Sequence, residues 1–209
     1  MMNIAVLVSG GGTNLQALID AEKRGEIKGG KITCVISSNP DAYALKRAAD
    51  NGIASRVIER KRFDDRKSYT KAITEALIEE KADLVVYAGF MTILDEQIVR
   101  AFPNRMMNVH PALIPSFCGK GFYGLHVHDA VLESGVKLTG ATVHFVTEKC
   151  DGGPIILQKA VEVRNGDTSE VLQKRVMEQC EWKILPQAVS LFCEGRIKVV
   201  GNKTEIVEV

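Results

Sequence analysis

The chain has no excess of either charge: 27 Lys and Arg residues stand against 26 Asp and Glu residues among 209, a net charge of +1. The basic residues are interspersed with acidic ones, so the electrostatic footprint of a nucleic-acid-binding protein is missing. No long apolar run is present, and no basic region precedes the short apolar run in MMNIAVLVS. We therefore expect no nucleic-acid partner, no membrane span and no signal peptide, and a location in the cytoplasm.

The sequence also lacks a C-x-x-C motif. Its five cysteines are odd in number and scattered: Cys34, Cys118, Cys150, Cys180 and Cys193. This pattern favours free thiols in a reducing compartment over a disulfide framework. His126, His128 and His144 could supply metal ligands, but no nearby Cys or acidic residue completes a set, so we expect no metal.

Short apolar runs alternate with helical patterns in the first half of the chain. The apolar runs predict strands at 3–8, 31–38, 55–59, 82–89 and 105–111. Helical patterns lie between them, at 14–25, 41–52, 64–81 and 95–102. This alternation predicts an α/β fold with an open, mostly parallel, Rossmann-like sheet and helices on both faces.

The second half has a different pattern. After a loop rich in Gly and Pro at 111–125, we expect a short helix at 128–134 and strands at 137–146 and 154–163. One long helix follows over 166–196, and the C-terminal segment reads as a hairpin that turns at Gly201 and Asn202. Since no linker separates these segments, we expect a single domain over residues 1–209.

A glycine run, SGGGTN, joins the first strand to the first helix at residues 9–14. Such a loop lets the backbone approach an anion, and the helix N-terminus offers unpaired N–H groups, so a phosphate-bearing ligand is the natural expectation. The dinucleotide fingerprint is not met, because Leu15 occupies its third glycine position. The alternative is a plain tight turn between strand and helix.

Two polar motifs complete the candidate site. Asn108 and His110 in NVHP are two residues apart in a predicted strand and so point to the same side, at the carboxyl end where open α/β sheets place their sites. Asp151 stands before two glycines in CDGGP, and beside an imidazole it would raise the pKa of the His. Structural alternatives remain: a satisfied core histidine and an ordinary Asp-Gly turn.

Five segments together resemble the glycinamide ribonucleotide transformylases, the folate-dependent phosphoribosylglycinamide formyltransferases of purine synthesis. They are NIAVLVSGGGTNLQALIDA, LVVYAGFMTIL, NVHPALIP, GLHVH and TGATVHFVTEKCDGGPIILQ. The resemblance implies a formyltransferase fold, with a nucleotide-binding half at 1–110 and a folate-site and C-terminal half at 111–209. It also implies 10-formyltetrahydrofolate as co-substrate, glycinamide ribonucleotide as acceptor, and no metal.

The resemblance further implies three sets of site residues. The set expected to bind the ribonucleotide is Gly12, Thr13, Asn14 and Glu181. The set expected to bind the folate is Arg66, Met91, Thr92, Ile93, Leu94 and Asn108. The set expected to carry catalysis is Asn108 as oxyanion donor, His110 as proton donor and acceptor, and Asp151 as the carboxylate that raises the pKa of His110.

This sequence departs from the family pattern in three places. Thr92 stands where many relatives have Arg, and CGKGF at 118–122 reads as an insertion. The spacing from Arg175 to Glu181 is one residue longer than the resemblance leads us to expect.

Other functions are compatible with the same motifs. One alternative is a formyl-folate enzyme with another acceptor, such as water or an amino sugar. The other is a non-catalytic nucleotide-binding module. The sequence is compatible with a monomer or a homodimer.

Overall fold

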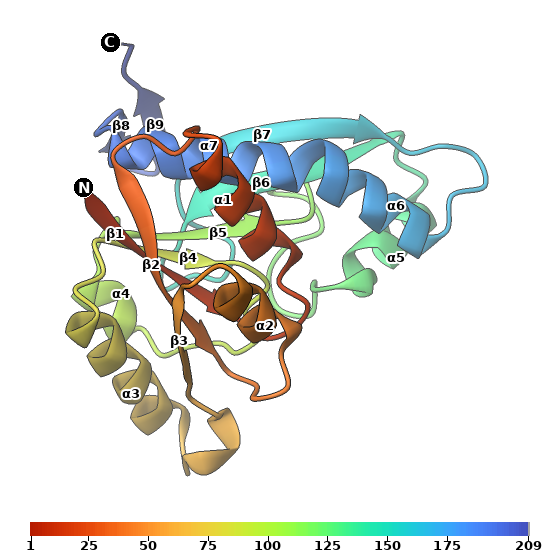
Figure 1. Cartoon of the computed structure of the whole chain (residues 1–209). Helices are drawn as coiled ribbons and strands as arrows, with labels where there is room; N and C mark the ends of the chain where they lie inside the picture. The colour runs from red at the N-terminus through yellow and green to blue at the C-terminus, as the bar shows by residue number, and fades with distance from the viewer. Residues whose placement is uncertain (209) are drawn as a thin grey trace.

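A computed structural model describes residues 1–208 of the chain, and seven of its strands form one sheet in the order β3-β2-β1-β4-β5-β6-β7 (Figure 1). These strands are β1 (Met2–Val8), β2 (Gly30–Ser37), β3 (Ala54–Val57), β4 (Leu84–Tyr87), β5 (Met106–His110), β6 (Leu138–Phe145) and β7 (Ile155–Glu162). The first five pair in parallel, whereas β6 and β7 pair antiparallel. The predicted open, mostly parallel sheet is confirmed.

The helices match the predicted pattern, with one interruption. They are α1 (Thr13–Lys23), α2 (Tyr43–Asp50), η1 (Arg60–Arg62), α3 (Arg66–Glu79), α4 (Gln97–Ala101), α5 (Leu125–Ser134), α6 (Ser169–Val176), η2 (Met177–Glu181) and α7 (Trp182–Cys193). The predicted long helix is the continuous run α6–η2–α7, in which η2 is a π-helical turn and Pro186 lies inside α7. Among the helices of residues 1–208, none combines the length and the apolar character that crossing a membrane requires.

Two apolar layers sandwich the sheet, and β1 contributes to both. Ile4, Val6 and Val8 pack into the layer under α1, α2, α5, α6 and α7. Ala5 and Leu7 point the other way, into the layer under α3 and α4. Alternate residues of a strand face opposite sides, so a strand buried on both faces must be apolar at nearly every position. This accounts for the unbroken run IAVLV.

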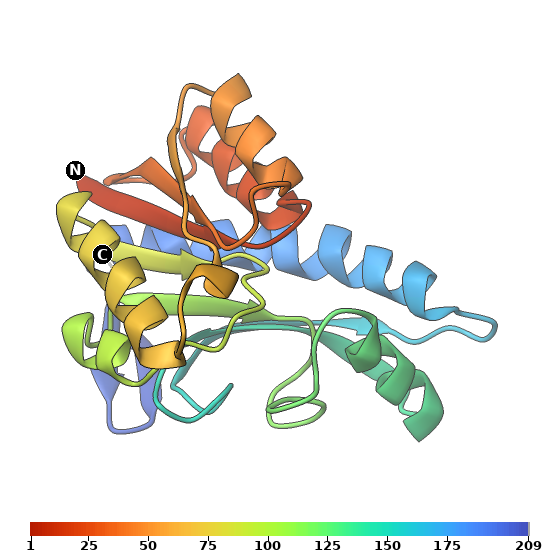
Figure 2. The ribbon, with the colours of Figure 1, turned by 90° about the horizontal axis from the view of Figure 1, so that it is seen from below.

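The two layers are visible when the molecule is turned. In Figure 2, α3 lies in front of the sheet and the run α6–η2–α7 lies behind it. The predicted C-terminal hairpin is present as β8 (Ile197–Val200) and β9 (Lys203–Ile206), and the Thr204 hydroxyl donates to the Ile155 carbonyl at the start of β7, 2.7 Å away. Val209, the last residue of the predicted hairpin segment, lies outside the described residues.

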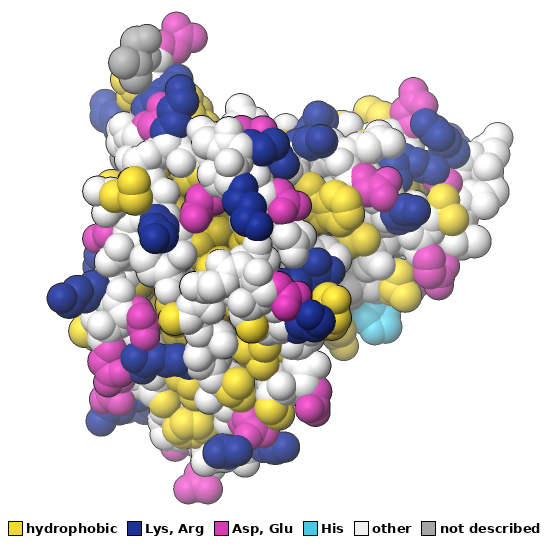
Figure 3. Space-filling view, viewed as in Figure 1, with side chains coloured by type: hydrophobic (Ala, Val, Ile, Leu, Met, Phe, Trp, Pro, Cys, Tyr) yellow, Lys and Arg dark blue, Asp and Glu magenta, His cyan; other side chains and the backbone are white. Residues whose placement is uncertain are grey.

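The surface carries both signs of charge. In Figure 3, Lys and Arg side chains are intermixed with Asp and Glu side chains over the face shown. Charged side chains also form close pairs on the surface, such as Lys46 with Asp50 and Arg56 with Glu79. The charge is therefore balanced locally at these pairs as well as in sum.

Candidate active site

The loops that follow β1, β4 and β5 meet at one edge of the sheet. The strand order reverses between β1 and β4: the chain runs outward through β2 and β3 on one side and through β5 on the other. The carboxyl ends of parallel strands share an edge, and open α/β sheets place their sites at such a reversal. The Ser9 hydroxyl, after β1, accepts a hydrogen bond from the Met91 backbone N–H, after β4, at 2.9 Å. The glycine loop and the segment at 91–94 are thus joined directly.

The glycine loop is shaped by a close approach to α2. Gly12 has a left-handed conformation, with φ of 70°, and a Cβ there would lie 2.6 Å from the Cβ of Ala44. Only glycine fits this position. The Arg47 side chain donates to the Gly11 carbonyl at 2.9 Å, which holds the loop in place. Because Gly12 has no side chain to cap α1, the first-turn N–H groups are left open for an anion.

Asn14, in the first turn of α1, lies against Glu181 of the C-terminal helix. Its amide nitrogen donates to the Glu181 carboxylate at 2.7 Å. Burial raises the pKa of Glu181 to about 7, and the hydrogen bond from Asn14 opposes this rise. The structure therefore brings together Thr13, Asn14 and Glu181, which the sequence analysis assigned to one ligand.

The extra residue before Glu181 is explained by η2. A π-helical turn bonds i to i+5 and is wider than an α-helical turn, so it takes up one additional residue inside a continuous helix. η2 ends at Glu181, and Thr13 donates a long contact of 3.9 Å to the sulfur of Met177 at its start. The longer spacing therefore leaves Glu181 in contact with the α1 N-terminus.

Asn108, His110 and Asp151 also come together. Asn108 and His110 lie on β5 and Asp151 lies in the loop between β6 and β7; the Nδ1 atom of His110 is 3.7 Å from Oδ2 of Asp151. That distance suits an ion pair but exceeds a normal hydrogen bond. The predicted contact between residues 110 and 151 is present, although the two groups do not hold each other by a hydrogen bond.

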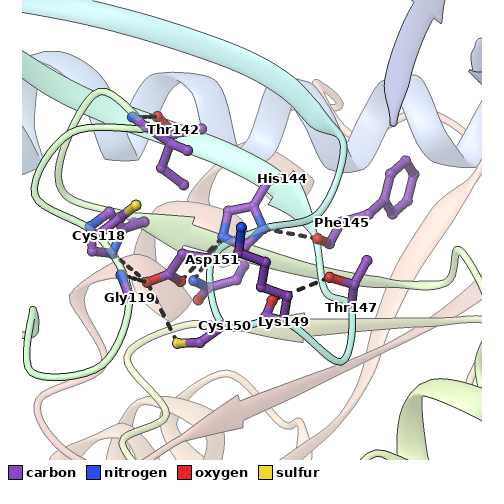
Figure 4. Close-up of polar contacts among 12 residues, drawn as sticks. Cys118, Gly119, Thr142, His144, Phe145, Thr147, Lys149, Cys150 and Asp151 are labelled. Carbon is purple, nitrogen blue, oxygen red and sulfur yellow. Dashed lines mark hydrogen bonds and ion pairs between the residues drawn. The ribbon is translucent and has the colours of Figure 1, made fainter. Parts of the chain in front are cut away.

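His144 is a fourth member of this cluster. It lies opposite Asn108 in the antiparallel β5–β6 pair. Its Nε2 atom is 3.5 Å from Oδ1 of Asp151 and 3.3 Å from the Asn108 amide nitrogen. Figure 4 shows Asp151 between His144 and the Gly119 backbone. Asp151 is thus held at both carboxylate oxygens.

The charges of the cluster follow from these contacts. Burial lowers the pKa of His110, against the opposing effects of the Phe117 carbonyl and Asp151. The predicted effect of Asp151 has the expected sign, but burial outweighs it and the net pKa of His110 falls. For Asp151, burial alone would raise the pKa, yet the contacts from His144 and the Gly119 N–H together lower it to about 2. Near neutral pH the site therefore pairs an ionised Asp151 with a neutral His110.

A cleft opens beside the cluster. Its lining residues come from 90–96, 98–99 and 146–151, together with Tyr87, Asn108 and His144. Met91, Thr92, Ile93 and Leu94, predicted to bind the folate, all line it. Arg66 is not among the lining residues, but its guanidinium lies 3.6 Å from Asp95, which does line the cleft. Its contact with the folate stays a prediction.

The sequence matches the model of the formyl transferase family over residues 2–189. The phosphoribosylglycinamide formyltransferase of Escherichia coli (strain K12) is 42% identical over 201 residues, which are 96% of this chain and 92% of that protein. The chain belongs to the formyl transferase family, as a phosphoribosylglycinamide formyltransferase. The crystal structure of glycinamide ribonucleotide transformylase 1 from Symbiobacterium toebii has a TM-score of 0.94 and 42% identity, and the match covers 100% of this chain and 95% of that one.

A structure with lower identity bears on the alternative in which water is the acceptor. A formyltetrahydrofolate deformylase from Pseudomonas syringae pv. tomato has a TM-score of 0.88 at 28% identity, and the match covers 99% of this chain and 66% of that one. The fold is therefore shared between transferase and hydrolase. The higher identity to the phosphoribosylglycinamide formyltransferases places this enzyme with them.

Two groups of the candidate site are not predicted from the sequence. From the sequence, His144 appears only as a possible metal ligand, and among residues 1–208 no group of three His, Cys, Asp or Glu is arranged to hold a metal ion. The place of His144 opposite Asn108 follows from the β5–β6 register, which the sequence does not specify by itself. The Phe117 carbonyl, 2.8 Å from Nε2 of His110, had no signal in the side-chain pattern because it is a backbone group.

Proposed function

We propose that this formyltransferase moves the formyl group of 10-formyltetrahydrofolate to the amine of glycinamide ribonucleotide, a step of purine synthesis. The observation that carries the proposal is the cleft at residues 91–94, which also contains Asn108 and Asp151. Membership of the formyl transferase family supports formyl transfer as the reaction class. The names of the relatives support glycinamide ribonucleotide as the acceptor. The cleft offers a place for the formyl donor next to polar groups suited to acyl transfer.

We assign the ribonucleotide to the α1 N-terminus. Its phosphate would lie against the open N–H groups at Gly12 and Thr13, where the helix dipole favours an anion. Two buried groups would meet the rest of the ligand: the Glu181 carboxyl, and the side-chain amide oxygen Oδ1 of Asn14, which has no hydrogen-bond partner within residues 1–208. A buried acceptor without a partner is costly, so it supports a ligand that donates a hydrogen bond there.

We assign the folate to the cleft. The backbone of 91–94 offers hydrogen-bonding groups at one wall, while Tyr87, Ile98 and Val99 provide apolar surface. A flat heterocycle with several donors and acceptors fits such a mixture of polar edges and apolar faces. Bound there, the formyl group would lie close to Asn108.

The reaction then proceeds by direct attack. The amine nitrogen of the ribonucleotide forms a bond to the formyl carbon, and the carbonyl oxygen becomes a tetrahedral oxyanion that accepts a hydrogen bond from Asn108. The attacking nitrogen releases one proton to Nδ1 of His110, which is neutral because burial lowers its pKa. The imidazolium that forms is stabilised by Asp151. When the bond from carbon to N10 of the folate breaks, His110 returns the proton to N10.

The test is an absorbance assay of folate deformylation, with and without glycinamide ribonucleotide. We expect turnover only when the ribonucleotide is present, and a loss of at least about two orders of magnitude in kcat for His110→Ala. His126→Ala is the matched control, because His126 is exposed on α5, and it should retain parental kcat.

Two outcomes would contradict the proposal. Deformylation that does not depend on the ribonucleotide would make water or another amine the acceptor. Absence of deformylation by folded protein would leave a binding module without catalysis.

A further inference from the structure

A three-residue turn, Phe117 to Gly119, contacts two titratable members of the candidate cluster, His110 and Asp151. The Phe117 carbonyl oxygen is 2.8 Å from Nε2 of His110. The Gly119 backbone N–H donates to Oδ2 of Asp151, also at 2.8 Å (Figure 4). His110 and Asp151 are 3.7 Å apart, beyond hydrogen-bond distance, so the turn supplies the hydrogen bonds that the two side chains do not give each other.

The Phe117 contact determines which ring nitrogen of His110 carries the proton. A carbonyl oxygen only accepts hydrogen bonds, so Nε2 must be the donor. A neutral imidazole carries one proton, and therefore its lone pair is on Nδ1, the atom that faces Asp151. This is the tautomer that accepts a proton on the side of the cluster where the reaction would take place.

The turn has the conformation that this contact requires. Phe117 has a φ of 49°, in the left-handed region that non-glycine residues rarely adopt, and Gly119 has a φ of 91°. The Phe117 ring packs edge-to-face on Phe122 and against the main apolar layer, which anchors the turn. A rare backbone conformation held by packing next to a reactive group indicates a positioning role.

We propose that the turn Phe117–Gly119 is a positioning element for formyl transfer: it fixes the tautomer of His110 through the Phe117 carbonyl and the carboxylate of Asp151 through the Gly119 N–H. This inference rests on the proposed function for its catalytic consequence. The titratable groups around His110 are the carboxylate of Asp151 and the imidazoles of His144 and His128. Asp151 is the acidic member of this set and is ionised near neutral pH. The turn therefore supplies an uncharged acceptor for the proton on Nε2, while Nδ1 faces the carboxylate of Asp151.

Gly119 and Gly121 provide a matched pair of variants. Both have a φ near 90° (91° and 97°), and at neither would a Cβ meet a heavy atom within 4 Å, so alanine adds the same backbone strain at both. Only Gly119 contacts Asp151. We expect Gly119→Ala to lower kcat by about tenfold or more with both KM values within threefold of the parent, because displacement of a catalytic group lowers the rate of the chemical step. Gly121→Ala should keep kcat within twofold.

Substitutions of Phe117 test the tautomer of His110 directly, by a measurement that does not depend on turnover. In ¹⁵N NMR of histidine-labelled protein, with the His110 signals assigned by their loss in His110→Ala, the parent should show the Nε2–H form above its pKa. Phe117→Val places a β-branched residue in the left-handed region, so the carbonyl should turn away and the Nε2–H form should give way to a mixture. Phe117→Tyr keeps the ring that anchors the turn and should keep the parental form.

The two measurements separate this inference from the function. A parent with His110 in the Nδ1–H form, or an unchanged spectrum in folded Phe117→Val, would overturn the positioning role even if transfer proceeds. Equal kcat in Gly119→Ala and Gly121→Ala would overturn it as well. If the parent forms no formylated ribonucleotide, the proposed function fails, while the NMR comparison still decides whether the turn fixes the tautomer.

Discussion

Asn14 and Glu181 are 167 positions apart in the sequence and share a 2.7 Å hydrogen bond in the interior. This contact joins the first turn of α1, at the carboxyl edge of the parallel strands, to the π-helical turn η2 of the C-terminal helix. A carboxyl group buried with one neutral partner loses more solvation than it recovers, which is why its pKa rises to about 7. The fold therefore holds a buried carboxyl group at the site proposed for the ribonucleotide, and ionisation of this group costs stability.

The first prediction measures that cost. The pKa of Glu181 is raised from 4.5 to about 7 on folding, so the folded state binds more protons than the unfolded state between these values. The free energy of unfolding should therefore fall as pH rises from 4.5 to 7, by roughly 3 kcal/mol from this group. Glu181→Gln keeps an acceptor for Asn14 and should remove this fall. In urea unfolding, the free energy of unfolding of Glu181→Gln should therefore rise relative to that of the parent as the pH increases from 4.5 to 7.

Glu178→Gln is the control for this prediction. Glu178 lies in the same η2 turn but is exposed, 3.9 Å from Lys174. The free energy of unfolding of the Glu178→Gln variant should follow the parental pH dependence. If Glu181→Gln and the parent gave parallel curves from pH 4.5 to 7, the raised pKa of Glu181 would be wrong.

The second prediction concerns Asn108, the proposed oxyanion donor. Asn108→Ala removes an amide that lines the cleft, and loss of one such donor should lower kcat by about two to three orders of magnitude with little change in KM. Steady-state rates at saturating folate and ribonucleotide provide the measurement. Asn202→Ala, in the exposed β8–β9 turn, is the control and should keep parental kcat. A rise in KM alone would assign Asn108 to binding.

Much of this arrangement could be predicted from local pattern. The unbroken apolar run of β1 predicts a strand buried on both faces. The spacing of Asn108 and His110 predicts that they share one side of β5, since alternate residues of a strand point the same way. These inferences depend only on residues close together in the sequence and on the periodicity of regular structure.

What could not be predicted depends on register or on backbone groups. His144 contacts Asp151 because β6 pairs with β5 in one antiparallel register, which the sequence does not specify by itself. The Phe117 carbonyl reaches His110 through a left-handed residue that no side-chain pattern indicates. The ion pair of Arg66 with Asp95 joins residues 29 positions apart, and no local pattern indicates it.

The third prediction concerns stability away from the site. Arg175 is nearly buried and holds Asp167 in a two-pronged ion pair, with distances of 2.5 and 2.6 Å, and it also donates to the Glu162 carbonyl. Removing one partner leaves a buried charge, so Asp167→Asn should lower the free energy of unfolding by about 3 kcal/mol or more in urea titration. Asp50→Asn, which breaks the exposed pair with Lys46, should cost less than about 1 kcal/mol. Equal costs would contradict the role of burial.

The fourth prediction uses the opposite pKa shift. The contacts with His144 and the Gly119 N–H lower the pKa of Asp151 from 3.8 to about 2 on folding, so the stabilisation from this group is fully present above pH 4 and is lost as the pH falls toward 2. Asp151→Asn should therefore lower the free energy of unfolding at pH 7 by roughly 2 kcal/mol, and the difference from the parent should vanish near pH 2. Asp41→Asn, at an exposed loop position, should stay within about 0.5 kcal/mol of the parent at both values. A difference that persisted unchanged at pH 2 would show that the lost stability comes from packing of the side chain, and that the contacts with His144 and Gly119 do not stabilise its charge.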